Sequence, residues 1–250
     1  EILSGLVGSE MCIRDRIKPE DIGGTKLGAL GIPEFGTDFA MQMLMDTKPQ
    51  YFSDLVRIAG LAHGTDVWLG NAQTLIKEGK ATISTAICTR DDIMIYLIQK
   101  GLDSEESFKI MEMVRKGKVA SGKCKEWPEW KQDMIDHGVP DWYIWSCERI
   151  KYMFPKAHAA AYVMMAWRVA YCKVFYPLAY YTAYFSIRAT AFDYEKMAMS
   201  PVRLEHYIAE YKAKKAEGTI SNTEEDELGV MRIVQEMHAR GYELTPIDIY

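Results

Sequence analysis

The stretch Arg149-Ile-Lys-Tyr-Met-Phe-Pro-Lys-Ala-His-Ala-Ala-Ala-Tyr162 lies in a long segment that has no carboxylate side chain. Neither Asp nor Glu occurs between Glu148 and Asp193, although the chain of 250 residues carries a formal net charge of -5. The segment is rich in aromatic rings and contains six cations, namely Arg149, Lys151, Lys156, Arg168, Lys173 and Arg188. A local excess of positive charge attracts phosphate, whether on a nucleotide, a nucleic acid or a lipid headgroup.

Pro155 marks the start of a predicted helix, because proline fits the first helical turn. The backbone N–H groups at a helix N-terminus are free and carry a partial positive charge. Lys156 and His158 add cationic donors there, and Tyr152 offers a flat face for a base. This pattern predicts phosphate binding. The alternative is that Lys156 is a solvated surface lysine and His158 packs at an ordinary interface.

Three other polar segments are candidates for the same site. Arg115-Lys116-Gly117-Lys118 ends a predicted helix, where cations are also expected because they offset the helix dipole. Arg90 begins another helix, and Asp91 and Asp92 behind it are the usual acids of a first turn rather than a metal pair. The loop from residue 63 to 73 has side chains that could contact a base or a sugar, or could be structural: His63, Asp66, Asn71 and Gln73.

The composition is that of an ordinary globular protein, with 48% hydrophobic and 26% charged residues. Five cysteines form no CxxC pair and the five histidines are isolated, which argues for a reducing compartment and against a zinc site. The most apolar region, Ala157 to Ile187, is interrupted by Arg168, Lys173 and Pro177, whereas a membrane span needs ~20 apolar residues. We therefore expect a cytoplasmic, soluble protein without a membrane partner.

Apolar residues at helical spacing predict a mostly α chain with little strand. A short strand is expected over residues 27–32, and the polar, Trp-bearing stretch from Val119 to Asp133 is expected to be an irregular surface excursion. Phe108 is expected to face inward from the helix that begins at Asp103. The other helices are expected at about 37–47, 53–60, 72–78, 141–152, 157–174, 178–187, 197–215 and 224–240, together with one that begins at Ser84 or Thr89 and ends near Gly101.

Familiar catalytic motifs are missing from the sequence. It has no GxxxxGK[ST] loop and no GxGxxG, GxSxG or HExxH motif. It also has no pair of carboxylates in an apolar, strand-like context that would suit two Mg²⁺ ions. The residues therefore show no familiar catalytic motif, and they leave phosphate binding and an ordinary structural role as the two interpretations of the cations.

Five motifs together resemble the PolC-type replicative DNA polymerase III alpha subunit of low-GC Gram-positive bacteria. They are Gly31-Ile-Pro-Glu-Phe-Gly-Thr37, Leu61-Ala-His-Gly-Thr-Asp-Val-Trp-Leu-Gly-Asn-Ala-Gln73, Arg90-Asp-Asp-Ile-Met94, Lys109-Ile-Met-Glu-Met-Val-Arg-Lys-Gly-Lys118 and Ile150-Lys-Tyr-Met-Phe-Pro-Lys-Ala-His-Ala-Ala-Ala-Tyr162. The resemblance spans about Ile17 to Tyr250. The last motif also resembles the wider family of bacterial replicative polymerases.

The resemblance implies the end of the palm region and an irregular multi-helix fingers domain, as a fragment of a larger multidomain DNA-directed DNA polymerase. It implies a connector over residues 17–36, a nucleotide-binding fingers core over 37–192, and a C-terminal helical part over 193–250. Residues 1–16 resemble translated sequencing-adapter sequence, and we expect them to be non-native. The family's catalytic carboxylates lie upstream, so this fragment alone is expected to be inactive.

The resemblance also implies which residues bind the incoming dNTP. Those expected near the phosphates are Arg90, Arg115, Lys116, Lys118, Lys151, Lys156 and His158, with Tyr152 near the base or sugar and His63, Asp66, Asn71 and Gln73 in the neighbouring loop. Mg²⁺ is expected to be bound by the palm region together with the dNTP. The implied partners are primer-template DNA, the rest of the polymerase chain, a sliding clamp and other replisome subunits. The alternative is a non-enzymatic helical module that binds nucleic acid or nucleotides.

Overall fold

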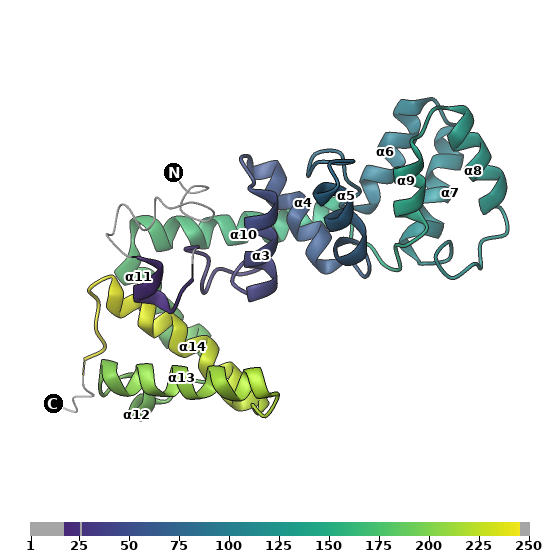
Figure 1. The fold of residues 1–250 in the computed structure, drawn as a ribbon. Helices are drawn as coiled ribbons and strands as arrows, with labels where there is room; N and C mark the ends of the chain where they lie inside the picture. The colour runs from purple at the N-terminus through teal and green to yellow at the C-terminus, as the bar shows by residue number, and fades with distance from the viewer. Residues whose placement is uncertain (1–17, 26, 246–250) are drawn as a thin grey trace. The chain divides into compact units, whose positions relative to one another are not determined.

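The computed structural model describes residues 18–25 and 27–245, and every regular element in these ranges is a helix (Figure 1). Strand-like pairing in these ranges is limited to one antiparallel bridge, between Thr65 and Tyr152. The prediction of a mostly α chain is therefore confirmed. The segment 1–16, expected to be non-native, lies outside the described residues.

The chain divides into two compact units, which are described separately here. Unit 1 combines the residues up to Met41 with those from Ala166 onward, and unit 2 comprises Gln42 to Met165. Both borders fall inside helices, because α3 spans Asp38–Thr47 and α10 spans Lys156–Phe175. The functional boundaries expected near residues 36 and 192 stay predictions.

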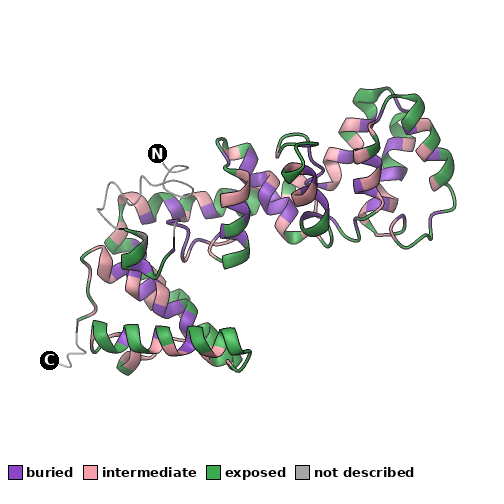
Figure 2. Ribbon diagram, viewed as in Figure 1, coloured by how far each residue is buried: buried purple, intermediate pink, exposed green. Residues whose placement is uncertain are grey.

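Unit 2 is built from short helices. They are α4 (Phe52–His63), the kinked turn η2 (Trp68–Ala72), α5 (Gln73–Lys77), α6 (Arg90–Lys100), α7 (Ser104–Arg115), α8 (Trp127–Asp136), α9 (Asp141–Cys147) and the first half of α10. Helix α6 packs on α7, and Tyr96 of α6 stacks on Tyr143 of α9 at 4.2 Å between ring centroids. Buried and exposed residues alternate along these helices (Figure 2), and Ile93, Ile110 and Val114 are fully buried.

Unit 1 contains a helical hairpin and several shorter elements. Its elements are η1 (Pro19–Ile22), α11 (Pro177–Ala183), the π-helical turn η3 (Tyr184–Arg188), α12 (Tyr194–Met197), α13 (Pro201–Glu217) and α14 (Asn222–Ala239). The left-handed Gly218 (φ 72°) ends α13, and a capping box between Ser221 and Glu224 begins α14. Leu204 and Met231, both buried, belong to the apolar faces that α13 and α14 turn to each other.

Helix α10 begins at Lys156, directly after Pro155, as the sequence predicts. It continues for 20 residues to Phe175, and its buried positions include small alanines such as Ala159 and Ala166. None of the helices in the described part of the chain, α10 included, combines the length and the apolar composition that a membrane crossing requires.

The strand expected over residues 27–32 is wrong, because these residues form successive turns. Gly31 adopts a left-handed conformation (φ 70°) that a strand cannot contain. The apolar side chains of Leu27, Leu30 and Ile32 are nevertheless buried. Their spacing therefore reflects burial of a folded connector rather than the alternation of a strand.

The surface excursion expected from Val119 to Asp133 is wrong over its second half. Residues from Trp127 onward form α8, with Pro128 in the first turn, where proline is tolerated. Trp130 is buried against the unit, so this aromatic residue anchors α8. The inward orientation expected for Phe108 is also wrong, because its side chain is 50% exposed while Ile110 and Met111 of α7 are buried.

A buried ion pair in unit 1 joins the connector to two helices. Lys173 of α10 and Glu236 of α14 are 1% and 0% exposed, and Lys173 Nζ lies 2.7 Å from Glu236 Oε1. The ammonium also donates to the backbone carbonyls of Gly28 and Leu30, and Tyr181 Oη donates to Glu236 at 2.6 Å. Burial lowers the pKa of Lys173, while the neighbouring carboxylate opposes that shift.

Removing the buried ammonium should strongly destabilise unit 1. Lys173→Ala leaves the Glu236 carboxylate buried without a cation, and breaking one partner of such a pair costs about 3–5 kcal/mol. Lys215→Ala is the control, because it removes the exposed pair with Glu225 and should cost less than about 1 kcal/mol. Urea denaturation followed by circular dichroism measures both. Equal losses in the two variants would contradict a structural role for the buried pair.

Candidate functional site

Residues 151–155, here called the connecting segment, are non-helical and lie between α9 and α10. Backbone groups withdrawn from water need hydrogen-bond partners, and these residues find them in three separate places. Lys151 N donates to Thr65 O at 3.1 Å and Thr65 N donates to Tyr152 O at 2.9 Å. Met153 N donates to Arg115 O at 3.3 Å, and Arg90 N donates to Phe154 O at 3.1 Å. The connecting segment therefore joins the loop after α4, the end of α7 and the start of α6.

Close approach of the α7 terminus to the connecting segment depends on Gly117. This residue has φ 66°, and a Cβ atom added to it would lie 2.6 Å from the carbonyl oxygen of Lys151. Real Cβ atoms essentially never come so close to another heavy atom. Glycine therefore provides both the left-handed turn and the space that bring the cations at the end of α7 beside Lys151.

Three of the predicted cations converge on one carboxylate, Glu112 of α7. Arg115 donates to it through Nε and through Nη2, the latter at 2.8 Å. Lys116 Nζ lies 2.8 Å from Glu112 Oε2, and Arg90 Nη1, from α6, lies 4.0 Å from Glu112 Oε1. The hydrogen bond from Arg115 is the main reason that the pKa of Glu112 falls to about 2. We call these four residues the Glu112 cluster.

The lysines of the connecting segment and of α10 have carboxylate partners of their own. Lys151 Nζ lies 2.7 Å from Asp66 Oδ2, and Lys156 Nζ lies 3.5 Å from Asp92 Oδ1. The backbone N–H of Lys156, at the start of α10, donates to Asp91 Oδ2 at 2.6 Å. Asp91 therefore caps α10, and Asp92 both accepts hydrogen bonds at the start of α6 and pairs with Lys156.

These contacts redistribute the positive charge that the sequence suggests. Five of the six predicted Lys and Arg residues contact four carboxylates, namely Asp66, Asp91, Asp92 and Glu112. The ammonium groups of Lys151 and Lys156 each have one carboxylate partner. The positive surplus therefore lies at the Glu112 cluster, where three cations share one carboxylate, and at the exposed Lys118, which follows α7.

Aromatic rings form a row beside the cations, with Phe154 at its centre. Tyr152 meets Phe154 edge to face at 5.3 Å, and His63 does so at 5.6 Å. His158 stacks on Phe154 at 4.9 Å and contacts Tyr162 at 4.5 Å. Tyr152 remains 45% exposed, so this aromatic residue is accessible from solvent.

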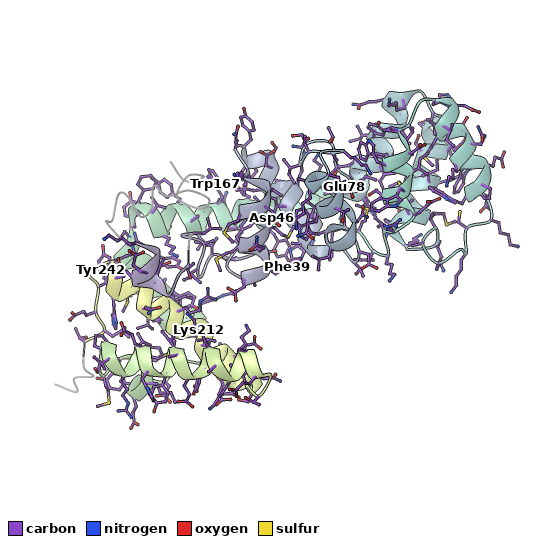
Figure 3. All side chains as sticks on the ribbon, viewed as in Figure 1. Phe39, Asp46, Glu78, Trp167, Lys212 and Tyr242 are labelled. Carbon is purple, nitrogen blue, oxygen red and sulfur yellow. The ribbon has the colours of Figure 1, made fainter. Side chains whose placement is uncertain are left out.

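The loop after α4 contributes in unequal ways. Asp66 pairs with Lys151, whereas Asn71 is 1% exposed and holds the loop together through hydrogen bonds with Asp66 O and Ser146. Gln73 donates to Asp46 Oδ2 at 3.2 Å, and Asp46 is labelled in Figure 3. Asn71 and Gln73 therefore have partners within unit 2, and the proposed nucleotide contacts of this loop stay predictions.

Lys156 also lines a cavity of about 320 Å³ between α6, α9 and the loop before α6. Arg57 contributes a second cation to this cavity, and Tyr96 and Trp142 contribute aromatic walls. Each of the two cations already contacts a carboxylate, Asp54 for Arg57 and Asp92 for Lys156. The cavity is thus a mixed polar and aromatic hollow, and its lining does not include the Glu112 cluster.

Sequence reasoning missed two residues that organise the site. The ion pairs of Glu112 could have been predicted from the sequence, because Glu112 lies three residues before Arg115 and four before Lys116, the spacing at which helical ion pairs form. Phe154 carried no such signal, since its contacts with His63 and with the backbone of Arg90 come from distant parts of the chain. Within the described ranges, no group of three or more His, Cys, Asp or Glu side chains could hold a metal ion.

Comparison with known proteins places the chain in a class. Residues 22–138 match the family described as the bacterial DNA polymerase III alpha subunit finger domain. The part of the chain that ends with α8 is therefore similar to a finger domain of this type.

Curated relatives make the assignment more specific. The chain is 51% identical over 234 residues to the PolC-type DNA polymerase III of Caldanaerobacter subterraneus subsp. tengcongensis and 53% identical over 234 residues to that of Streptococcus suis. These matches cover 94% of this chain and 16% of each relative. The protein of the same name from Bacillus subtilis is 52% identical over 227 residues, 91% of this chain and 15% of the relative. The resemblance to PolC-type DNA polymerase III is confirmed, and the chain spans about a sixth of those proteins' length.

The close approach at Gly117 can be tested with a matched pair of glycine substitutions. Gly117→Ala should lower the free energy of unfolding by more than about 2 kcal/mol, because it adds a backbone clash to the cost of a left-handed alanine. Gly122→Ala has nearly the same φ (68°) and open space around it, so it should cost only about 1 kcal/mol. Thermal melts measure both. Equal destabilisation would mean that the turn does not press on the connecting segment.

Proposed function

We propose that this chain forms the finger region of a replicative DNA-directed DNA polymerase and binds the incoming dNTP and the nascent base pair during template-directed synthesis. The observation that carries the proposal is the surplus of positive charge at the end of α7, next to the exposed ring of Tyr152. The family match and the relatives support it. The polymerase activity belongs to the whole protein, of which this chain would supply one part.

The Glu112 cluster supports the phosphate role through its chemistry. Arg presents a planar fork of donors that matches phosphate oxygens, and Lys adds a compact charge. Arg115 and Lys116 come from one turn and Arg90 from another helix, so they can contact different oxygens of a triphosphate. Fixed cations at this position would stabilise the negative charge that develops on the leaving pyrophosphate.

The exposed face of Tyr152 supports a role near the base or the sugar. Stacking of a base on an aromatic ring is worth roughly 1–3 kcal/mol and does not depend on which base is present. The edge-to-face contact with Phe154 holds the Tyr152 ring in place, and the backbone bridge to Thr65 fixes its main chain. A rigid platform of this kind suits any of the four nucleotides.

The chemistry of nucleotide transfer is assigned to residues outside this chain. Mg²⁺ supplies charge neutralisation for the triphosphate and activates the attacking hydroxyl. Since the described residues offer no cluster of metal ligands, we assign the ion to catalytic carboxylates of the palm region. The partners of the complete protein would be primer-template DNA, a sliding clamp and other replisome subunits, in the cytoplasm. The competing proposal, a helical binding module without an enzyme, shares the phosphate site but lacks the palm.

Loss of a cation from the proposed site should weaken nucleotide use by a full-length polymerase that carries this segment. Lys116→Ala should raise the dNTP KM about tenfold, the size expected for one hydrogen bond to a charged group. Lys156→Ala should raise it less, because the ammonium of Lys156 already pairs with Asp92. Lys109→Ala, on the exposed face of α7, is the control and should not change the KM. Unchanged kinetics in all three variants would contradict the proposed function.

The isolated chain should bind DNA weakly and incorporate no nucleotide. Binding should fall steeply as salt rises, because it depends on cations that displace counterions from phosphates. Fluorescence anisotropy of a labelled primer-template measures the binding, and primer extension with Mg²⁺ and dNTPs measures the activity. Primer extension by the isolated chain would overturn the assignment of the catalytic groups to another part of the protein.

A further inference from the structure

The Glu112 cluster places three cations around one carboxylate, and the cations come from two helices. Arg115 and Lys116 lie at the end of α7, one turn after Glu112, whereas Arg90 begins α6. The contacts of Glu112 with Arg115 and Lys116 are direct, and the one with Arg90 is longer, at 4.0 Å. Glu112 is therefore the shared partner of the groups that carry the surplus charge.

Cations so close together repel one another, and the repulsion is strong where water is partly excluded. The carboxylate offsets this repulsion and also directs the donors. Because Arg115 binds Glu112 through two nitrogens, the plane of its guanidinium group is fixed. Without that carboxylate, flexible Arg and Lys side chains would spread apart into solvent.

The side chains of the Glu112 cluster differ in how far they are exposed to solvent. The side chain of Glu112 is 18% exposed and that of Arg115 is 22% exposed, whereas those of Arg90 and Lys116 are 34% and 50% exposed. An anion that approaches from solvent therefore finds Arg90 and Lys116 more accessible than the carboxylate. This difference in exposure fits a supporting role for Glu112.

We infer that Glu112 is a positioning residue for phosphate binding, which holds Arg90, Arg115 and Lys116 together so that they meet the triphosphate as one preorganised group. The inference rests on the proposed function, and it assigns a task to a residue that would not touch the nucleotide. It also explains why a carboxylate stands at the centre of the most positive part of the site.

A simpler electrostatic view gives the opposite expectation. Removing the charge of Glu112 raises the surplus at the cluster from two positive charges to three, which should tighten the binding of an anion. Positioning requires instead that the same change weakens binding, because the cations lose their common partner. The sign of the effect therefore separates the two views.

The test is Glu112→Gln in a full-length polymerase that carries this segment, with steady-state kinetics at varied dNTP concentration. The dNTP KM should rise about tenfold, with a smaller change in kcat, because a neutral amide cannot hold three cations. Glu105→Gln is the control, since it removes the exposed pair with Lys109 on the same helix. It should leave the KM unchanged. A KM for Glu112→Gln that is unchanged or lower overturns the inference.

Two further variants keep the outcome decisive. Glu112→Asp retains the charge on a shorter side chain and should raise the KM less than Glu112→Gln does; equal increases overturn a role that depends on charge. Arg115→Ala tests the proposed function directly. If Arg115→Ala raises the KM and Glu112→Gln does not, only the positioning role fails. If neither changes it, the phosphate site itself is misassigned. Thermal melts of each variant show whether a purely structural loss accompanies the kinetics.

Discussion

Backbone hydrogen bonding by the connecting segment is the constraint on which the candidate site depends. An extended piece of chain outside a sheet must satisfy its N–H and C=O groups with whatever backbone lies nearby. Here the backbone groups of Lys151 and Tyr152 pair with Thr65. The N–H of Met153 donates to the carbonyl of Arg115, and the carbonyl of Phe154 accepts from the N–H of Arg90. These bonds join main-chain groups, and the one to the end of α7 also requires the space that Gly117 leaves. They bring side chains from three helix ends together, and the charges then adjust to that placement.

The stretch without acids between Glu148 and Asp193 shows that the composition of one segment is a poor guide to the electrostatic field around it. Its lysines that contact other segments meet carboxylates from elsewhere in the chain: Lys151 meets Asp66, and Lys173 meets Glu236. Arg149 instead stacks on the Trp145 ring at 3.7 Å. Desolvation explains the pair of Lys173, since a buried cation is costly unless a partner accompanies it, whereas Lys151 and Asp66 are 65% and 44% exposed and form a surface pair. The remaining positive surplus therefore appears at the end of α7, outside that stretch.

The sequence predicted those features of the fold that depend on neighbouring residues alone. Pro155 correctly placed the start of α10, because its constraint on the chain acts within one turn. The strand over residues 27–32 failed because apolar spacing reports burial, and only the left-handed Gly31 distinguishes a folded turn from a strand. The surface excursion expected around Trp130 is wrong for a related reason. The sequence there is mostly polar, but it forms the helix α8, which buries the large Trp130 side chain. The cations of the site were named from their types and positions, and their roles stay predictions.

Partners across the chain were beyond such reasoning, and the Glu112 cluster shows why. The pairs with Arg115 and Lys116 follow from helical spacing, so a local rule predicts them. The approach of Arg90 does not, because it depends on the packing of α6 against α7 and on the bond from Arg90 to Phe154. Glu112 thus makes two kinds of contact. Those with Arg115 and Lys116 follow from helical spacing, and the one with Arg90 arises only in the folded chain. The position of Glu112 relative to Arg90 therefore depends on how α6 packs against α7. Any ligand that binds the three cations of the Glu112 cluster together would hold the start of α6 and the end of α7 at a fixed separation.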